Sequence, residues 1–121
     1  MPELWRKDGG RIMNEKYLGK ITRAEFGTVK DHPFLMGLQL DFSFDGSGCS
    51  CGGKYTVNIS GECKWKDQSE RQATITKHID EVYQILTDAK VNYVSQLVGK
   101  PVEVTIEDNT FKDFRILTDV L

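Results

Sequence analysis

The order of predicted elements indicates an α+β domain, in which a mainly antiparallel sheet of about five strands packs against one long helix. Three observations predict this class. Residues 34–44 alternate apolar and polar side chains, residues 75–89 place apolar side chains at helical spacing, and residues 102–121 return to alternation. The expected order is strand, strand, strand, helix, strand, strand. Strands grouped on either side of a helix in the chain are typical of an antiparallel sheet with the helix on one face.

The clearest strand spans residues 34–44. Its apolar residues recur at every second position, which is the pattern of a strand with one buried face. These residues are Met36, Leu38, Leu40, Phe42 and Phe44. Residues 17–26 form a weaker strand, and the polar connection 27–33 predicts that the two strands pair as an antiparallel hairpin.

A glycine-rich stretch, residues 45–53, follows this strand. Four of its nine residues are glycine, so it is expected to be a flexible connection rather than a strand. A third strand then places Tyr55, Val57 and Ile59 on one face and ends at Gly61.

The helix is predicted over residues 68–90. Its apolar residues step by four, three, four and three, which places them in a single stripe; they are Ile75, Ile79, Val82, Leu86 and Ala89. Asp67 followed by Glu70 predicts a capping box at its start, and Ser69 with Gln72 is an alternative frame. Residues 91–98 are expected to add one short helical turn.

The C-terminal third returns to strands. Residues 102–107 alternate, Asp108 and Asn109 signal a turn, and residues 111–121 run back as the last strand. Near its end this strand carries apolar residues on both faces, with Leu117 and Leu121 on the side opposite Ile116. We therefore expect it to be central in the sheet or covered by another subunit, and the chain to form a homo-oligomer.

The chain has 121 residues, which is the length of a single domain. Residues 1–16 are expected to form a flexible arm and residues 17–121 one α+β domain. Three cysteines are too few for a disulfide framework and fit a reducing compartment. No stretch has the features of a signal peptide or membrane span, so we expect a cytoplasmic protein with no membrane partner.

The sequence contains few residue patterns that would indicate a metal site, a phosphate-binding loop or a catalytic centre. Cys49, Cys51, Cys63 and His78 are the potential zinc ligands, but the one-residue gap between Cys49 and Cys51 is tight for a single ion. The glycine-rich stretch lacks the lysine of a phosphate-binding loop, and neither His32 nor His78 belongs to a catalytic motif. We therefore expect no metal, no cofactor and no enzymatic activity.

The net charge is −2, which makes a nucleic-acid partner unlikely because such partners favour a basic excess. Aromatic and basic residues adjoin at two places, at Trp65 with Lys66 and at Phe111 with Lys112 and Arg115. These five residues are the candidate ligand-binding set, since a ring can stack on a small anionic ligand while a cation pairs with it. The alternative is that the rings pack in the core and the cations extend to solvent.

Several segments carry a family resemblance: GKI (19–21), FG (26–27), GLQLDF (37–42), DAKV (88–91), LVGKPVEVT (97–105), DNTFK (108–112) and RILT (115–118). In these segments the chain resembles a family of small uncharacterised phage and prophage proteins. The middle of the chain departs from that family, because its usual aromatic-rich stretch is rich in glycine and cysteine here. The resemblance supplies no activity and no catalytic residues.

What the resemblance implies is a context for function. A small non-enzymatic phage protein often acts by binding, so we expect a counter-defence factor that sequesters a host protein or a small nucleotide signal. Two alternatives remain open at this point. The chain is then either a single-stranded nucleic-acid accessory protein with a small barrel-like sheet, or a self-associating virion or assembly component.

Overall fold

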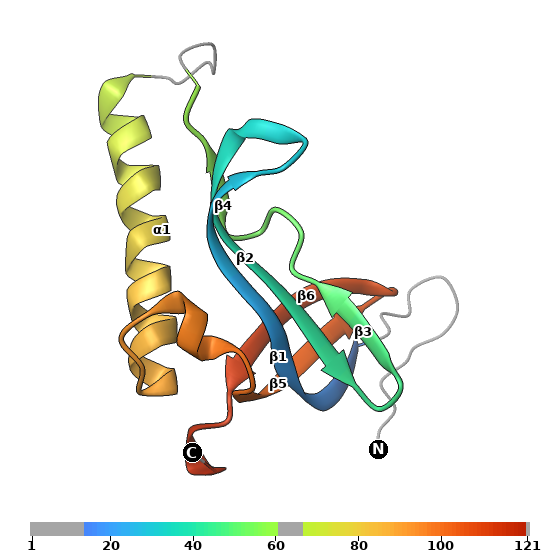
Figure 1. The fold of residues 1–121 in the computed structure, drawn as a ribbon. Coiled ribbons are helices and arrows are strands. Elements are labelled where there is room, and N and C mark those ends of the chain that lie inside the picture. The colour runs from blue at the N-terminus through green and yellow to red at the C-terminus, as the bar shows by residue number, and fades with distance from the viewer. Residues whose placement is uncertain (1–13, 61–66, 121) are drawn as a thin grey trace.

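The computed structural model describes residues 14–60 and 67–120 (Figure 1). Six strands and one α-helix form in this part of the chain: β1 (Asn14–Val29), β2 (His32–Phe44), β3 (Ser47–Ser50), β4 (Thr56–Asn58), α1 (Gln68–Ala89), β5 (Pro101–Glu107) and β6 (Thr110–Ile116). Two short 3₁₀ turns span Val94–Leu97 and Thr118–Val120. The predicted α+β class with an antiparallel sheet is confirmed.

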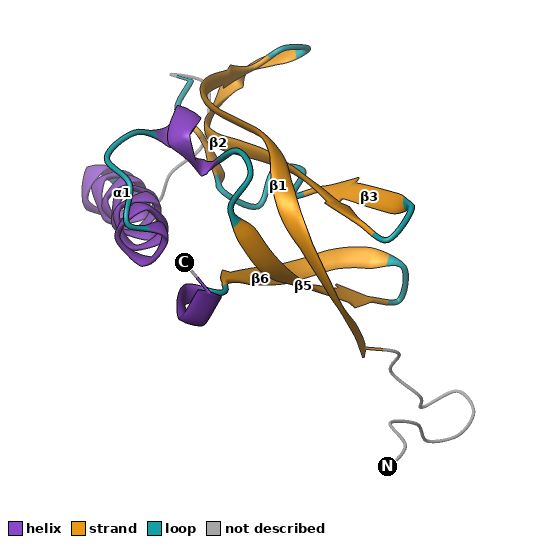
Figure 2. Ribbon diagram, turned by 60° about the horizontal axis from the view of Figure 1, so that its bottom comes forward, coloured by secondary structure: helices purple, strands orange, loops and turns teal. Residues whose placement is uncertain are grey.

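The long strand β1 joins the two halves of the sheet. Its first half pairs with β5 and its second half with β2, so that the strand order is β3-β2-β1-β5-β6, and β4 pairs with the far end of β2. The register of β1 against β2 shifts between Ile21 and Arg23, next to Lys20, where both pairings meet. Such an irregularity bends a strand, and Figure 2 shows β1 crossing both hairpins of the curled sheet.

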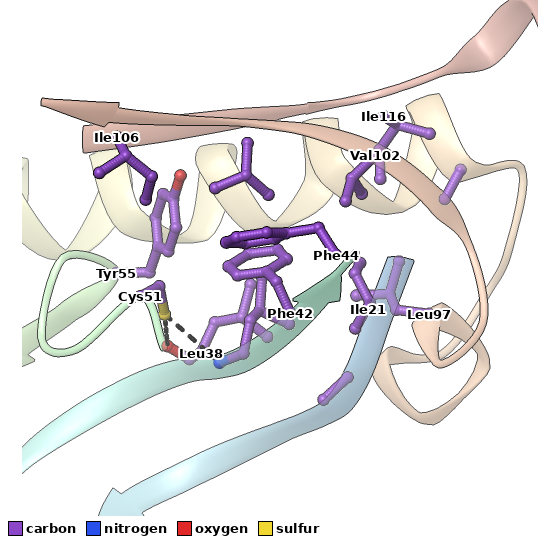
Figure 3. Packing of buried hydrophobic residues seen from close by; sticks show 14 residues of the cluster. Ile21, Leu38, Phe42, Phe44, Cys51, Tyr55, Leu97, Val102, Ile106 and Ile116 are labelled. Carbon is purple, nitrogen blue, oxygen red and sulfur yellow. Dashed lines mark hydrogen bonds between the residues drawn. The ribbon is translucent and has the colours of Figure 1, made fainter. Parts of the chain in front are cut away.

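The core lies inside this curl. Phe42 on β2 stacks on Phe111 of β6, with ring centroids 5.5 Å apart and planes 8° apart, so the two ends of the sheet face each other. Figure 3 shows the buried part of this core, with the rings of Phe42 and Phe44 between β2 and the β5–β6 hairpin. The alternation predicted for residues 34–44 is confirmed, since Leu38, Leu40, Phe42 and Phe44 are all buried.

The prediction that residues 45–53 form a flexible connection is wrong. Asp45 and Gly46 both take positive φ angles, 40° and 77°, which makes a tight turn and sends the chain back along β2 as β3. The strand then obtains its backbone hydrogen bonds from β2. Cys51, just beyond β3, is buried, and its Sγ accepts a hydrogen bond from the Leu40 N–H at 3.3 Å.

The structure also differs from the prediction at both ends of the domain. β1 begins at Asn14, so residues 14–16 of the expected arm pair with β5. β6 ends at Ile116 and lies at one end of the strand order, so a central position for the last strand is wrong. The chain turns into the 3₁₀ turn after Leu117, which leaves Val120 exposed. Leu121 lies outside the described residues, and cover by a second copy stays a prediction.

The helix matches its predicted span of 68–90 to within a residue. Asp67 caps it by accepting a hydrogen bond from the Glu70 N–H at 2.8 Å, and Lys90 ends it in the left-handed conformation. Along the predicted stripe Ala89 is fully buried, and Ile75, Val82 and Leu86 are half-buried. Ile79, near the middle of α1, departs from the stripe because it is 53% exposed.

Candidate functional site

The space left between α1 and the sheet is the candidate site, which we call the α1 groove. It has a volume of about 260 Å³. Its walls come from three elements of the sheet side and one face of the helix. The lining residues are Phe26, Met36, Gly37, Val57, Ile59, Arg71, Ile75, His78 and Ile79.

The sheet side of the groove is the end of the β1–β2 hairpin that lies beyond the core. Phe26, which lines the groove, is still 42% exposed there. β4 crosses this end and pairs with β2 from Leu35 to Gly37. Apolar side chains of the sheet therefore face α1 without a complete cover.

The helix side follows from spacing along α1. Arg71, Ile75, His78 and Ile79 lie four, three and one residues apart, so they share one face of the helix. Tyr83, which does not line the groove, is 69% exposed. The groove is thus bounded by an ordinary amphipathic face, but one that includes a cation.

Two polar side chains stand among the nine lining residues. One Nη atom of Arg71 donates a hydrogen bond to the carbonyl oxygen of Ile59 at 3.4 Å. Nδ1 of His78 lies 3.0 Å from the carbonyl oxygen of Thr74. Because a carbonyl oxygen only accepts, Nδ1 carries the proton, and Nε2 is the nitrogen left to meet a ligand.

This combination suits binding rather than reaction. Among the described lining residues there is no carboxylate, hydroxyl or thiol, so these residues do not supply the nucleophile and acid partner of a catalytic pair. Concave apolar sites with one or two placed polar groups are typical of small-molecule binding sites.

Three of the five predicted ligand-binding residues lie in the part of the chain that the structure describes, all of them on β6. Trp65 and Lys66 lie outside the described residues. Phe111 is half-buried and stacks on Phe42 in the core. Lys112 lies 3.5 Å from Glu107, and Arg115 donates to Glu103 at 2.9 Å. Binding of an anionic ligand by this set stays a prediction, and the ring and cations point to packing and surface ion pairs.

The potential zinc ligands that the structure describes lie in different parts of the fold. Burial raises the pKa of the Cys51 and Cys49 thiols, so both stay protonated at neutral pH. Cys51 lies in the core, whereas His78 lines the α1 groove. Cys63 lies outside the described residues, and among the others no three metal-binding side chains gather.

Sequence reasoning missed the groove and Arg71. The available signal was that Arg71 stands four residues before Ile75, in line with the apolar stripe. A cation at the end of an apolar stripe is also typical of a solvent-exposed first turn of a helix. The pattern therefore does not distinguish a cation that lines a groove from one that faces solvent.

No family model, curated protein or solved structure matches this chain. Within residues 14–60 and 67–120, no helix is both long and apolar enough to cross a membrane. The chemistry of the α1 groove is therefore the basis for assigning a function.

Proposed function

We propose that this protein is a non-enzymatic binding protein that holds a small, mainly apolar molecule in the α1 groove. The observation that carries the proposal is the incomplete closure of α1 onto the sheet, which leaves Ile79 half exposed beside Phe26 and Met36. An apolar ligand that covers these side chains would gain roughly 25 cal/mol for each Å² of apolar surface removed from water.

The size of the groove favours a small molecule over a protein partner. Its 260 Å³ equals the volume of roughly nine water molecules, at ~30 Å³ each. A stable protein–protein interface buries about 1,200 Å² or more in total, which this groove alone does not offer. A compact molecule of about ten non-hydrogen atoms fits.

The phage resemblance supplies a setting for this activity, namely sequestration of a host molecule as counter-defence. Within that setting, the groove favours an apolar molecule over a nucleotide signal. Phosphate groups call for several cations and backbone donors, whereas the described lining residues include one permanent cation, Arg71, and one other polar side chain, His78.

The neutral fluorescent probe N-phenyl-1-naphthylamine tests the proposal, because its emission rises on entering an apolar site. Saturable binding to the wild-type chain is expected. Ile79→Gln should weaken it about threefold to tenfold, since part of an isoleucine's apolar contact is lost. Tyr83→Gln is the matched control, because Tyr83 is an exposed position on the same helix outside the groove. Equal binding by both variants, or no saturable binding, would refute the proposal.

The connectivity favours a second candidate function. The sheet is antiparallel and curled, with five strands on its main path and β4 beside it, and the helix precedes the last two strands (Figure 2). Partly open five-stranded sheets of this kind occur in small barrels that bind single-stranded nucleic acids. Against it, Arg23 on the β1–β2 surface is paired with Asp41 and Glu25. Fluorescence anisotropy of a labelled oligothymidine at low salt tests this second candidate function. A sheet without a basic surface should not bind the oligonucleotide even at low salt, where electrostatic binding is strongest.

A further inference from the structure

We infer that the molecule in the α1 groove is a monocarboxylic acid, whose carboxylate Arg71 binds while its apolar chain lies against Ile75 and Ile79. This inference rests on the proposed function and adds the chemical class of the ligand. The argument for a carboxylate is the positive charge of Arg71, because a groove that bound only apolar molecules would not need a cation in its lining.

The main argument is the set of partners that the Arg71 side chain has among the described residues. The structure describes three arginines, and two of them have carboxylate partners: Arg23 pairs with Asp41 and Glu25, and Arg115 pairs with Glu103. Among the described residues the Arg71 side chain forms no ion pair, and its one hydrogen bond there is the long contact with the Ile59 carbonyl. A guanidinium has five N–H donors in a planar fork that matches a carboxylate, so within residues 14–60 and 67–120 most of its donors have no partner.

The surroundings of Arg71 strengthen an ion pair there. Its side chain is half-buried at the edge of apolar walls formed by Ile59 and Ile75. A carboxylate that meets the guanidinium at such a site is less screened by water than a surface pair is, and hydrogen bonds between two charged groups are the strong ones.

The lining selects against other head groups. None of the described lining residues is a carboxylate, so an ammonium head would face the Arg71 cation without a partner among them. A phosphate dianion would meet a single permanent charge. A chain of about eight carbons fills the volume of roughly nine waters available in the groove, and it would pass Ile75 toward His78, whose Nε2 lies free of the Thr74 contact.

The experiment displaces bound N-phenyl-1-naphthylamine with octanoate, octanol or octylammonium, which share one chain and differ in the head group. Octanoate is expected to compete about tenfold more tightly than octanol, and octylammonium least tightly. Equal competition by octanoate and octanol would overturn the inference.

Variants of the arginine complete the test. Arg71→Gln should bind the neutral probe as the wild type does and lose the preference for octanoate. Arg71→Lys should keep part of it, because the charge remains while the fork is lost. Arg115→Gln is the matched control, since it removes an arginine already paired with Glu103. An octanoate preference that survives in Arg71→Gln would overturn the assignment of Arg71.

The outcomes separate the inference from the proposed function. Absence of saturable probe binding contradicts both. Probe binding without head-group preference contradicts the carboxylate alone. Probe binding that weakens as the protein concentration rises would show that a second copy covers the groove, and this also contradicts the inference.

Discussion

Gly37 lies so close to the carbonyl of Tyr55 that a Cβ atom on residue 37 would stand 2.1 Å from the Tyr55 oxygen. The same oxygen accepts a hydrogen bond from the Leu38 N–H at 3.1 Å, and the Cys51 N–H donates to the Leu40 carbonyl at 3.0 Å. The connection from β3 to β4 is therefore held against β2 near both of its ends, and one side of this contact, Gly37, also lines the α1 groove.

The first prediction is that Gly37→Ala destabilises the fold severely. The added methyl group meets backbone, which cannot rotate away, so we expect a loss beyond the usual overpacking cost of about 1–3 kcal/mol. Urea unfolding followed by circular dichroism measures it. Gly27 is the register partner of Gly37 on β1, and a Cβ there meets nothing within 4 Å. Gly27→Ala should therefore leave the midpoint nearly unchanged, and similar losses in both variants would contradict the contact.

Much of the fold is readable from the sequence because burial is periodic. Leu38 and Leu40 recur at every second position and are fully buried, and Asp67 is the helix cap that the pattern predicts. β3 was missed because its glycine content argues against a strand. The local signal for it was Asp45-Gly46 directly after the alternating strand, since this dipeptide favours a two-residue hairpin turn and both residues take positive φ angles here.

The candidate site was not predictable for a related reason. The stripe that contains Ile75 and Ile79 shows which face of α1 is apolar, but not how closely that face approaches the sheet. The distance depends on where the β1–β2 hairpin ends in space, which is a long-range property. The stacking of Phe111 on Phe42 was not predictable for the same reason, because the two residues lie far apart in the chain.

The second prediction separates packing from surface charge on β6. Phe111→Ala should lower the free energy of unfolding by about 2 kcal/mol, less than a fully buried phenylalanine because its ring is half-buried. Arg115→Ala should cost under about 1 kcal/mol, since its ion pair with Glu103 is exposed on the arginine side. Denaturant midpoints of the two variants provide the measurement. A larger loss in Arg115→Ala than in Phe111→Ala would show that β6 packs differently.

The third prediction concerns alkaline pH. Burial, and then the negative charge of Asp113, raise the pKa of the Tyr55 phenol well above its ordinary value. Above pH ~10 the unfolded chain loses this proton while the folded chain keeps it. Stability should therefore fall as the pH rises past 10, by up to about 1.4 kcal/mol per pH unit from this group.

Urea unfolding between pH 8 and 11 tests this dependence in Tyr55→Phe, with Tyr83→Phe as the control at an exposed tyrosine. Tyr55→Phe should show a shallower fall above pH 10 than the wild type, while Tyr83→Phe should follow the wild type. Identical slopes in all three proteins would contradict a buried, protonated Tyr55.

The last prediction concerns the two halves of α1. The C-terminal half packs through Ala89, Leu86 and Val82, whereas the N-terminal half borders the groove and depends on the Asp67 cap. Amide hydrogens of residues 72–79 should therefore exchange faster than those of residues 82–89, because local opening there breaks fewer contacts.

The variant Asp67→Ala should lower the free energy of unfolding by about 1 kcal/mol and speed exchange in the first half of α1 alone. Asp80→Ala is the matched control, because it makes the same chemical change away from the cap. Uniform protection along the helix, unchanged in Asp67→Ala, would mean that α1 closes fully onto the sheet and that the groove does not stay open in solution.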